Sequence, residues 1–466
     1  MRFLIIFFIC LFFTKGYAND MELSGIDISQ FNEEFKPQDD FYDYVNHNWL
    51  SKTEIPDDQI GWGSYMTLRE ESLQNQNILI NALIKNKDNL IASSEEEKIA
   101  NLYLSYTNRD LVNKLGSLPL SDDIEAIKNI KNKTDLWKYF SESEKKGMSS
   151  PIYFAVYDDL KDPLNYTIYF GQSGLGLPDR DYYLLDQPHY IKGREEYPIH
   201  LSNLFDLSGL DNANERASNA FDVETELAKI QISRTERRDP EKTYNPMNVN
   251  DLDAISNSNF NLWLKNLAIE SYDRYIIESP KYLEDLSNLI DEIPIDQWKD
   301  YLLARLVKSA SGSLSDDFVD ESYRFSSILT GREEMPALWK RSVGIVNGLL
   351  GDALGKIYVK NHFPPEYKQR MVELIDNLLE SFRIGIEDLE WMSEETKKRA
   401  LIKLEKLNVK IGYPEVWKDY NGLEFSDNDL YGNIKAASEF GYKDALKKLS
   451  EKVDRKRWAM SPQTVN

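Results

Sequence analysis

The chain has 466 residues, of which 41% are hydrophobic and 12% aromatic, so its composition excludes an intrinsically disordered protein and allows a large packed interior. The length exceeds that of one ordinary hydrophobic core and predicts two or more domains. A formal net charge of −22 repels phosphate backbones and anionic lipid surfaces, so we expect no nucleic-acid partner.

The first 18 residues have the layout of a secretory signal peptide. Arg2 supplies a basic start, an apolar run extends from Phe3 to Phe13, and Gly16 and Ala18 supply small residues before a cleavage point. The apolar run is too short to span a bilayer comfortably, so we expect no stable membrane span. The prediction is an exported protein, periplasmic or extracellular. The alternative is an uncleaved anchor or a misassigned start of the sequence.

The first helices are expected over residues 74–90 and 95–107. A different pattern follows at residues 151–172, where two aromatic and β-branched runs flank a polar turn at Asp162-Pro163 and predict a β-hairpin. The glycines and proline of residues 173–185 then predict a loop of special backbone geometry.

The rest of the chain again shows helical spacing of apolar residues, which makes the expected fold class mainly α. In the last long helix Met371, Leu374 and Leu378 lie on one face. Ser393 predicts the cap of a further helix that ends near Gly412. The long helices are expected over residues 216–232, 284–308, 336–356 and 365–391.

No self-contained catalytic motif is found. None of the four histidines, His47, His189, His200 and His362, has a second histidine three or four residues away, so no helix presents a histidine pair to zinc. We expect each to be a surface or hydrogen-bonded residue. Cys10 is the only cysteine, and its loss with the signal peptide would exclude a thiol nucleophile and a cysteine metal site. A serine elbow and a phosphate-binding loop are also missing.

Several stretches together resemble one family, the neprilysin and endothelin-converting-enzyme-like zinc metallopeptidases, including the bacterial secreted endopeptidase type. The likeness covers essentially everything after residue 25, in order, and the chain resembles the amino-terminal region only. Its main motifs are QDDFYDYVNHNWL at 38–50, TEIPDD at 53–58, SGLGLPDRDYYL at 173–184, TYNPMNVNDL at 243–252, MSEETKKRALIKLEKLNVKIGYPEVW at 392–417 and RWAMSPQTVN at 457–466.

The resemblance implies an exported zinc metalloendopeptidase that hydrolyses peptides. In the family a His-Glu-x-x-His motif and a later glutamate bind zinc and activate water, and this sequence stops before them. We therefore expect zinc in the complete enzyme, no catalytic residue and no zinc ligand in this chain, and no activity of the chain alone.

The same resemblance implies a domain plan. Residues 1–18 would be the signal peptide, and residues 19–70 the amino-terminal part of a zincin-type catalytic domain whose zinc-binding half is absent. Residues 71–420 would be a large helical cap domain with a small β-hairpin that encloses the substrate cavity. Residues 421–466 would be a return segment that leads into the missing catalytic half.

Two residues are expected to bind substrate by resemblance. Asn466 falls on an asparagine that hydrogen-bonds the substrate backbone, and Arg69 on one of two arginines that grip a terminal carboxylate. The other arginine falls on Gly61, which weakens that grip. The alternative for Arg69 is an ion pair on the helix surface with Glu70 or Glu71. His47 replaces a family glycine, at some cost if that position needs positive φ.

Two alternatives remain open. A separately encoded piece could supply the zinc site and dock onto the apolar end of this chain near Trp458. The chain could instead be a non-catalytic peptide-binding or scaffold protein derived from the peptidase family. Peptides are the expected partners in either reading.

Overall fold

The computed structural model describes residues 28–256 and 259–465, so the predicted signal peptide lies outside the described residues. The chain divides into two compact units, one up to Pro56 and one from Asp57. The first contains α1 (Phe41–Leu50), which Asp40 caps by accepting a hydrogen bond from the Asp43 N–H at 3.0 Å. His47 lies inside α1 and does not have a positive φ, so the strain considered for this position does not arise.

The second unit is mostly helical, as predicted. The helices of 95–107 and 365–391 have the expected positions, whereas the single helix predicted over 284–308 is wrong because Pro294 separates two helices. The described helices are α2 (Ser64–Lys85), α3 (Glu95–Thr107), α4 (Arg109–Leu115), α5 (Ser121–Lys128), α6 (Lys133–Lys145), α7 (Asp181–Leu184), α8 (Pro188–Leu207), α9 (Ala213–Ile230), α10 (Pro240–Thr243), α11 (Val249–Ser256), α12 (Asn259–Asn266), α13 (Pro280–Glu292), α14 (Ile295–Ala310), α15 (Asp316–Thr330), α16 (Leu338–His362), α17 (Pro365–Asp388), α18 (Glu394–Glu405) and α19 (Leu430–Lys448).

The predicted hairpin is confirmed and belongs to a larger sheet. Strands β1 (Ile152–Asp158) and β2 (Tyr166–Gln172) pair antiparallel. β2 also pairs in parallel with β4 (Tyr275–Ile277), which pairs antiparallel with β3 (Asn245–Met247), giving the order β1-β2-β4-β3. The two added strands have three residues each, too few to show a period-two pattern in the sequence.

The first hydrophobic core joins this sheet to α6, α9, α12, α13 and α14. Its centre is aromatic: the ring centroids of Phe170 and Trp263 lie 5.0 Å apart at 71°, the edge-to-face arrangement that aromatic pairs favour. Trp137, Phe260 and Trp298 extend this cluster and are almost completely buried. Aromatic side chains thus fill much of the centre of this core.

The loop after β2 is held by a buried carboxylate. Glu224 of α9 is fully buried and accepts hydrogen bonds from the Gly176 N–H at 3.0 Å and from the Tyr197 hydroxyl at 3.1 Å. A Cβ atom at position 176 would overlap the Tyr197 hydroxyl, and Gly174 has a φ of +91°. Gly176 is thus required by the close approach of Tyr197, and Gly174 by its positive φ. This confirms the special backbone geometry predicted for residues 173–185.

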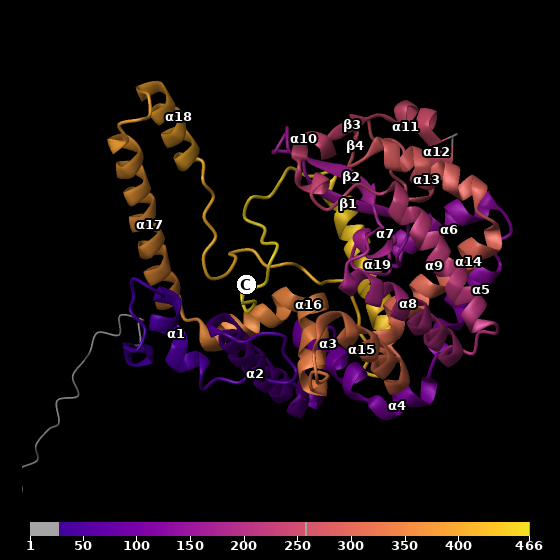
Figure 1. Ribbon diagram of the computed structural model, residues 1–466, viewed down its shortest axis with the longest axis horizontal. Coiled ribbons are helices and arrows are strands. Elements are labelled where there is room, and N and C mark those ends of the chain that lie inside the picture. Colours follow the sequence, from indigo (N-terminus) through magenta and orange to yellow (C-terminus); the bar gives the residue numbers. More distant parts are fainter. Residues whose placement is uncertain (1–27, 257–258, 466) are drawn as a thin grey trace, which may run out of the picture. The chain divides into compact units, whose positions relative to one another are not determined.

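A second core forms between α2, α3 and α16, which lie as neighbours (Figure 1). Ile80, Leu102 and Val346 are completely buried in it. α19 connects the two cores, because Phe440 packs against the second core whereas Tyr442 packs against the first.

α17 and α18 form a helical hairpin in which no residue is buried (Figure 1). Ser393 caps α18 as predicted, with its Oγ accepting from the Thr396 N–H at 3.3 Å, although the helix ends at Glu405 rather than near Gly412. Leu378 and Phe382 of α17 are 47% and 56% exposed. Among the described residues, no helix combines the length and apolar character needed to cross a bilayer.

Candidate substrate-binding surface

Arg69 lies on the outer face of α2 and is exposed. Its guanidinium makes no hydrogen bond or ion pair to any other described residue. The neighbouring Glu70 pairs instead with Lys340 of α16 at 2.9 Å, and Lys340 also contacts Asp58 at 2.7 Å. The ion pair considered for Arg69 is therefore not formed, and its charge is available to a ligand.

Lys340 holds the beginning of α2 against α16. Burial favours the neutral form of Asp58, but hydrogen bonds from Lys340 and Gln59 outweigh it and lower the pKa of Asp58. Burial alone would lower the pKa of Lys340, but its hydrogen bonds to Asp58 and Glu70 raise it. The pairing fixes the helix that carries Arg69, and a Cβ at Gly61 would meet nothing within 4 Å, so no side chain takes the place of the missing arginine there.

The terminal segment of the chain lies against α2 and α16. The Ser72 hydroxyl, one turn after Arg69, donates to the Gln463 carbonyl at 2.8 Å. The Gln463 side chain donates to Asn347 Oδ1 at 2.7 Å and to the Gly351 carbonyl at 2.9 Å, and Gln463 is only 3% exposed. This segment is thus fixed by buried polar contacts.

The network continues inside the helix pair. Gln76 donates to the Ser72 hydroxyl at 3.0 Å and accepts from Asn347 at 2.6 Å. A Cβ on Gly355 of α16 would come within 2.8 Å of the Gln463 amide oxygen, so the helix approaches the segment closely only because this residue is glycine. Asn466, the second predicted substrate residue, lies outside the described residues, and its role stays a prediction.

Near the end of the chain Trp458 is half-buried and Met460 is 44% exposed, whereas the polar Gln463 is buried. Ser72 and Gln76, which bind this segment, were not predicted from the sequence. A signal was present: Ser72, Gln76 and Ile80 recur every four residues on one face of α2, with polar residues where a core face is expected.

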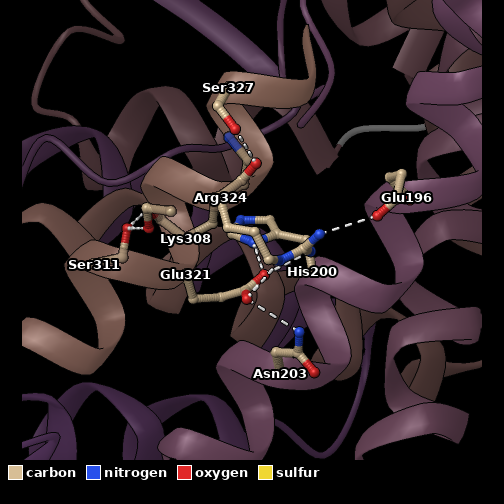
Figure 2. Close-up of polar contacts among 9 residues, drawn as sticks. Glu196, His200, Asn203, Lys308, Ser311, Glu321, Arg324 and Ser327 are labelled. Carbon is tan, nitrogen blue, oxygen red and sulfur yellow. Dashed lines mark hydrogen bonds and ion pairs between the residues drawn. The ribbon is translucent and has the colours of Figure 1, made fainter. Parts of the chain in front are cut away.

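The described histidines make local contacts, as expected. His200 of α8 is 1% exposed, and its Nδ1 lies 2.8 Å from Glu321 Oε1 of α15 (Figure 2). The His200 ring also stacks on Phe325. Burial lowers the pKa of His200, which favours a neutral ring that donates to Glu321. His189 packs against Tyr190, and His362 against Tyr358 at the end of α16.

Glu321 is the most strongly bonded carboxylate of this cluster. Although burial opposes ionisation, hydrogen bonds from His200, Arg324 and Asn203 lower the pKa of Glu321 to about 2. Arg324 also reaches Glu196 of α8 at 3.0 Å (Figure 2). The cluster joins α8 to α15, and its histidine, His200, hydrogen-bonds Glu321 across these two helices.

The described residues do not fit a zinc ion. Among them, no group of three or more histidine, cysteine, aspartate or glutamate side chains lies close enough together to hold a metal. A catalytic zinc needs three protein ligands with an open position.

The mostly helical fold with its small sheet superposes on a solved zinc metalloprotease structure. The family model described as Peptidase family M13 matches residues 37–414. The chain belongs to peptidase family M13.

Individual relatives agree with this assignment. The neutral endopeptidase of Lactobacillus helveticus is 29% identical over 440 residues, which cover 93% of this chain and 68% of that protein. Human endothelin-converting enzyme 1 is 28% identical over 94% of this chain and 60% of its own length. The structure of the Mycobacterium tuberculosis zinc metalloprotease Zmp1 in complex with an inhibitor superposes with a TM-score of 0.89 at 32% identity, covering 95% of this chain and 67% of that one. The chain thus spans roughly three fifths to two thirds of these relatives.

Proposed function

We propose that this chain is the amino-terminal region of an exported zinc metalloendopeptidase that hydrolyses peptides. The observation that carries the proposal is the family match over residues 37–414, supported by the superposition on a zinc metalloprotease. The groups that bind zinc and activate water would lie outside residues 1–466, further along the polypeptide or in a separately encoded piece. The chain alone would then be inactive. The signal-peptide pattern at residues 1–18 supports export to a periplasm or to the outside of the cell.

Two surfaces support an incomplete enzyme. The exposed apolar side chains of α17 form a face of the kind that another part of a protein covers, and we assign that cover to the catalytic part. The terminal segment is fixed against α2 and α16 at Gln463. Residues 71–420 would form the cap over the substrate cavity, with residues 19–70 and 421–466 belonging to the catalytic side. α2 runs continuously across the expected boundary at residue 70.

Arg69 would bind the carboxyl terminus of a peptide substrate. Its guanidinium is exposed and free of carboxylate partners among the described residues, and it lies one turn from the docked terminal segment. A single arginine gives a weaker grip than a pair, so the preference for free carboxyl termini should be modest.

The first experiment determines the nucleotide sequence of the source gene beyond the codon for Asn466. It then compares the hydrolysis of a fluorogenic peptide by two purified proteins, residues 1–466 and the longer product. We expect a downstream His-Glu-x-x-His and hydrolysis that 1,10-phenanthroline stops, in the longer product only. Hydrolysis by residues 1–466 that the chelator stops would overturn the assignment of the zinc site to other residues. A stop codon without a complementing piece, together with stable peptide binding, would favour the scaffold alternative.

In the active protein, Arg69→Ala should raise the KM roughly tenfold for a peptide with a free carboxyl terminus. The KM for the same peptide with an amidated carboxyl terminus should stay unchanged. Lys85→Ala is the matched control, because Lys85 is an exposed cation on the same helix. An equal effect of Arg69→Ala on both peptides would contradict the carboxylate assignment.

A further inference from the structure

A cavity of about 320 Å³ lies where the two hydrophobic cores meet. Its walls come from α3, α14, α16 and α19 and from the turn that follows α6. Apolar surface is supplied by Tyr106, Met148, Ile345 and Ile434. Small-molecule sites favour such junctions and start at about 300 Å³, so this cavity has the size of a small ligand site.

The charge of this cavity is opposite to that of the chain. Three cations, Lys146, Arg341 and Lys435, line it, and none of its described lining residues is a carboxylate, although the chain has a formal net charge of −22. Asp123 is 3% exposed and lies behind the wall, where it accepts from Lys435 at 2.9 Å and contacts Lys146 at 3.5 Å. Asp316 also lies close enough to Arg341 for the arginine charge to lower the pKa of this carboxyl group. Two carboxylates therefore face the three cations, which leaves an excess of one positive charge.

Arg341 is the least satisfied of the three cations. Its Nε donates to the Pro336 carbonyl at 3.0 Å, but its buried Nη1 makes no hydrogen bond to any described residue. A buried donor without a partner costs about 1–3 kcal/mol and needs an explanation.

The serine hydroxyl groups of the cavity do not accept a hydrogen bond from Arg341 Nη1. Ser309, Ser313 and Ser438 donate to backbone carbonyls of the preceding helical turn, at 3.0, 2.7 and 3.0 Å. The charged groups that line the wall are all donors, which is the requirement for an anion.

We propose that this cavity binds a small organic anion, a carboxylate carried on an aromatic or branched apolar group. The carboxylate would accept from the Arg341 guanidinium and from the lysine ammonium groups, and the apolar body would lie against Tyr106, Met148 and Ile345. The inference does not rest on the peptidase proposal, because the cavity shares no residue with the surface around Arg69 and Gln463.

Isothermal titration of the 466-residue chain tests this with three probes: N-acetyl-L-phenylalanine, its neutral amide and inorganic phosphate. The acid should bind roughly tenfold more tightly than either of the others, because only the acid has both the charge and the apolar body. Arg341→Gln should weaken acid binding by roughly tenfold or more. Arg399→Gln, a change of an exposed arginine on α18, is the matched control and should leave binding unchanged.

Equal affinities for the acid and the amide would show that the cavity does not select an anion. Equal affinities for the acid and phosphate would show that the apolar group of the ligand does not contribute to binding. Absence of acid binding would overturn the whole proposal. Because Arg341→Gln could disturb folding, Ile345→Phe supplies a second variant that fills the cavity and keeps all three cations. Acid binding retained in a folded Ile345→Phe variant would place the ligand elsewhere and overturn the site.

Discussion

At the scale of single residues, the most informative groups are buried and charged. Glu321 is held by three different side chains across two helices, and the hydrogen bonds outweigh the cost of its burial. The pKa of Glu321 is lower in the folded protein than its ordinary value of 4.5. Its contribution to stability is therefore complete above pH 4.5 and is lost as the pH falls toward 2.

Glu321→Gln should lower the free energy of unfolding at pH 7 by about 2 kcal/mol, because Arg324 loses its buried charge partner. The variant should also lose less stability than the wild type between pH 4.5 and pH 2, since it has no carboxylate to protonate there. Urea unfolding at pH 7 and at pH 3 measures both effects.

Glu196→Gln is the matched control for that prediction. Glu196 contacts the same arginine at 3.0 Å, but its side chain is 31% exposed. Its replacement should cost less than about 1 kcal/mol. Equal losses in the two variants would show that burial does not decide the strength of this contact.

At the scale of elements, α17 departs most from the rest of the unit. Its apolar stripe has the spacing of a core-facing helix, yet none of its residues is buried. Charged residues at its other positions form ion pairs along the helix, such as Arg383 with Glu380 and Glu387. Local contacts of this kind stabilise the helix while its apolar face stays open to a partner.

The double substitution Leu378→Glu and Phe382→Glu should reduce self-association of the chain, seen by light scattering, because it breaks the exposed apolar stripe. The free energy of unfolding should change by less than about 1 kcal/mol, since neither side chain is buried.

Leu286→Glu on α13 provides the contrast, because Leu286 is completely buried and a carboxylate there should cost more than about 3 kcal/mol. If the double substitution on α17 destabilised the chain as strongly as Leu286→Glu, the stripe would be packed in solution and its assignment as an open face would be wrong.

At the scale of the whole second unit, two cores are joined by α19 and by contacts between residues far apart in the sequence. The bond from Ser72 to Gln463 spans 391 positions. Such contacts form only after α2 and α16 have packed, so the docking of the terminal segment depends on the completed second core.

Gln463→Ala should release this segment, because Asn347 Oδ1 and the Gly351 carbonyl lose their donor. Hydrogen–deuterium exchange of residues 456–465 should then be roughly tenfold faster or more, as expected for the loss of about 1–3 kcal/mol of local stability. Thr464→Ala changes an exposed neighbour and should leave the rate nearly unchanged. Equal acceleration by both would exclude Gln463 as the anchor.

Local signals in the sequence determined much of this protein. Helical spacing predicted α3 and α17, Ser393 predicted the cap of α18, and two β-rich runs predicted the β1–β2 hairpin, because each of these depends on neighbours in the chain. The ordered motifs placed the chain in its family, and the family match over residues 37–414 confirms it.

Only the tertiary structure decided which charges are free and which are used. Glu70 pairs with Lys340 and leaves Arg69 open, and Arg341 lines a cavity without a partner for its Nη1 among the described residues. The three-residue strands β3 and β4 and the burial of Gln463 likewise depend on distant partners. An ion pair or a buried amide is set by what lies within a few ångströms, and such contacts between distant parts of the chain have no fixed spacing in the sequence.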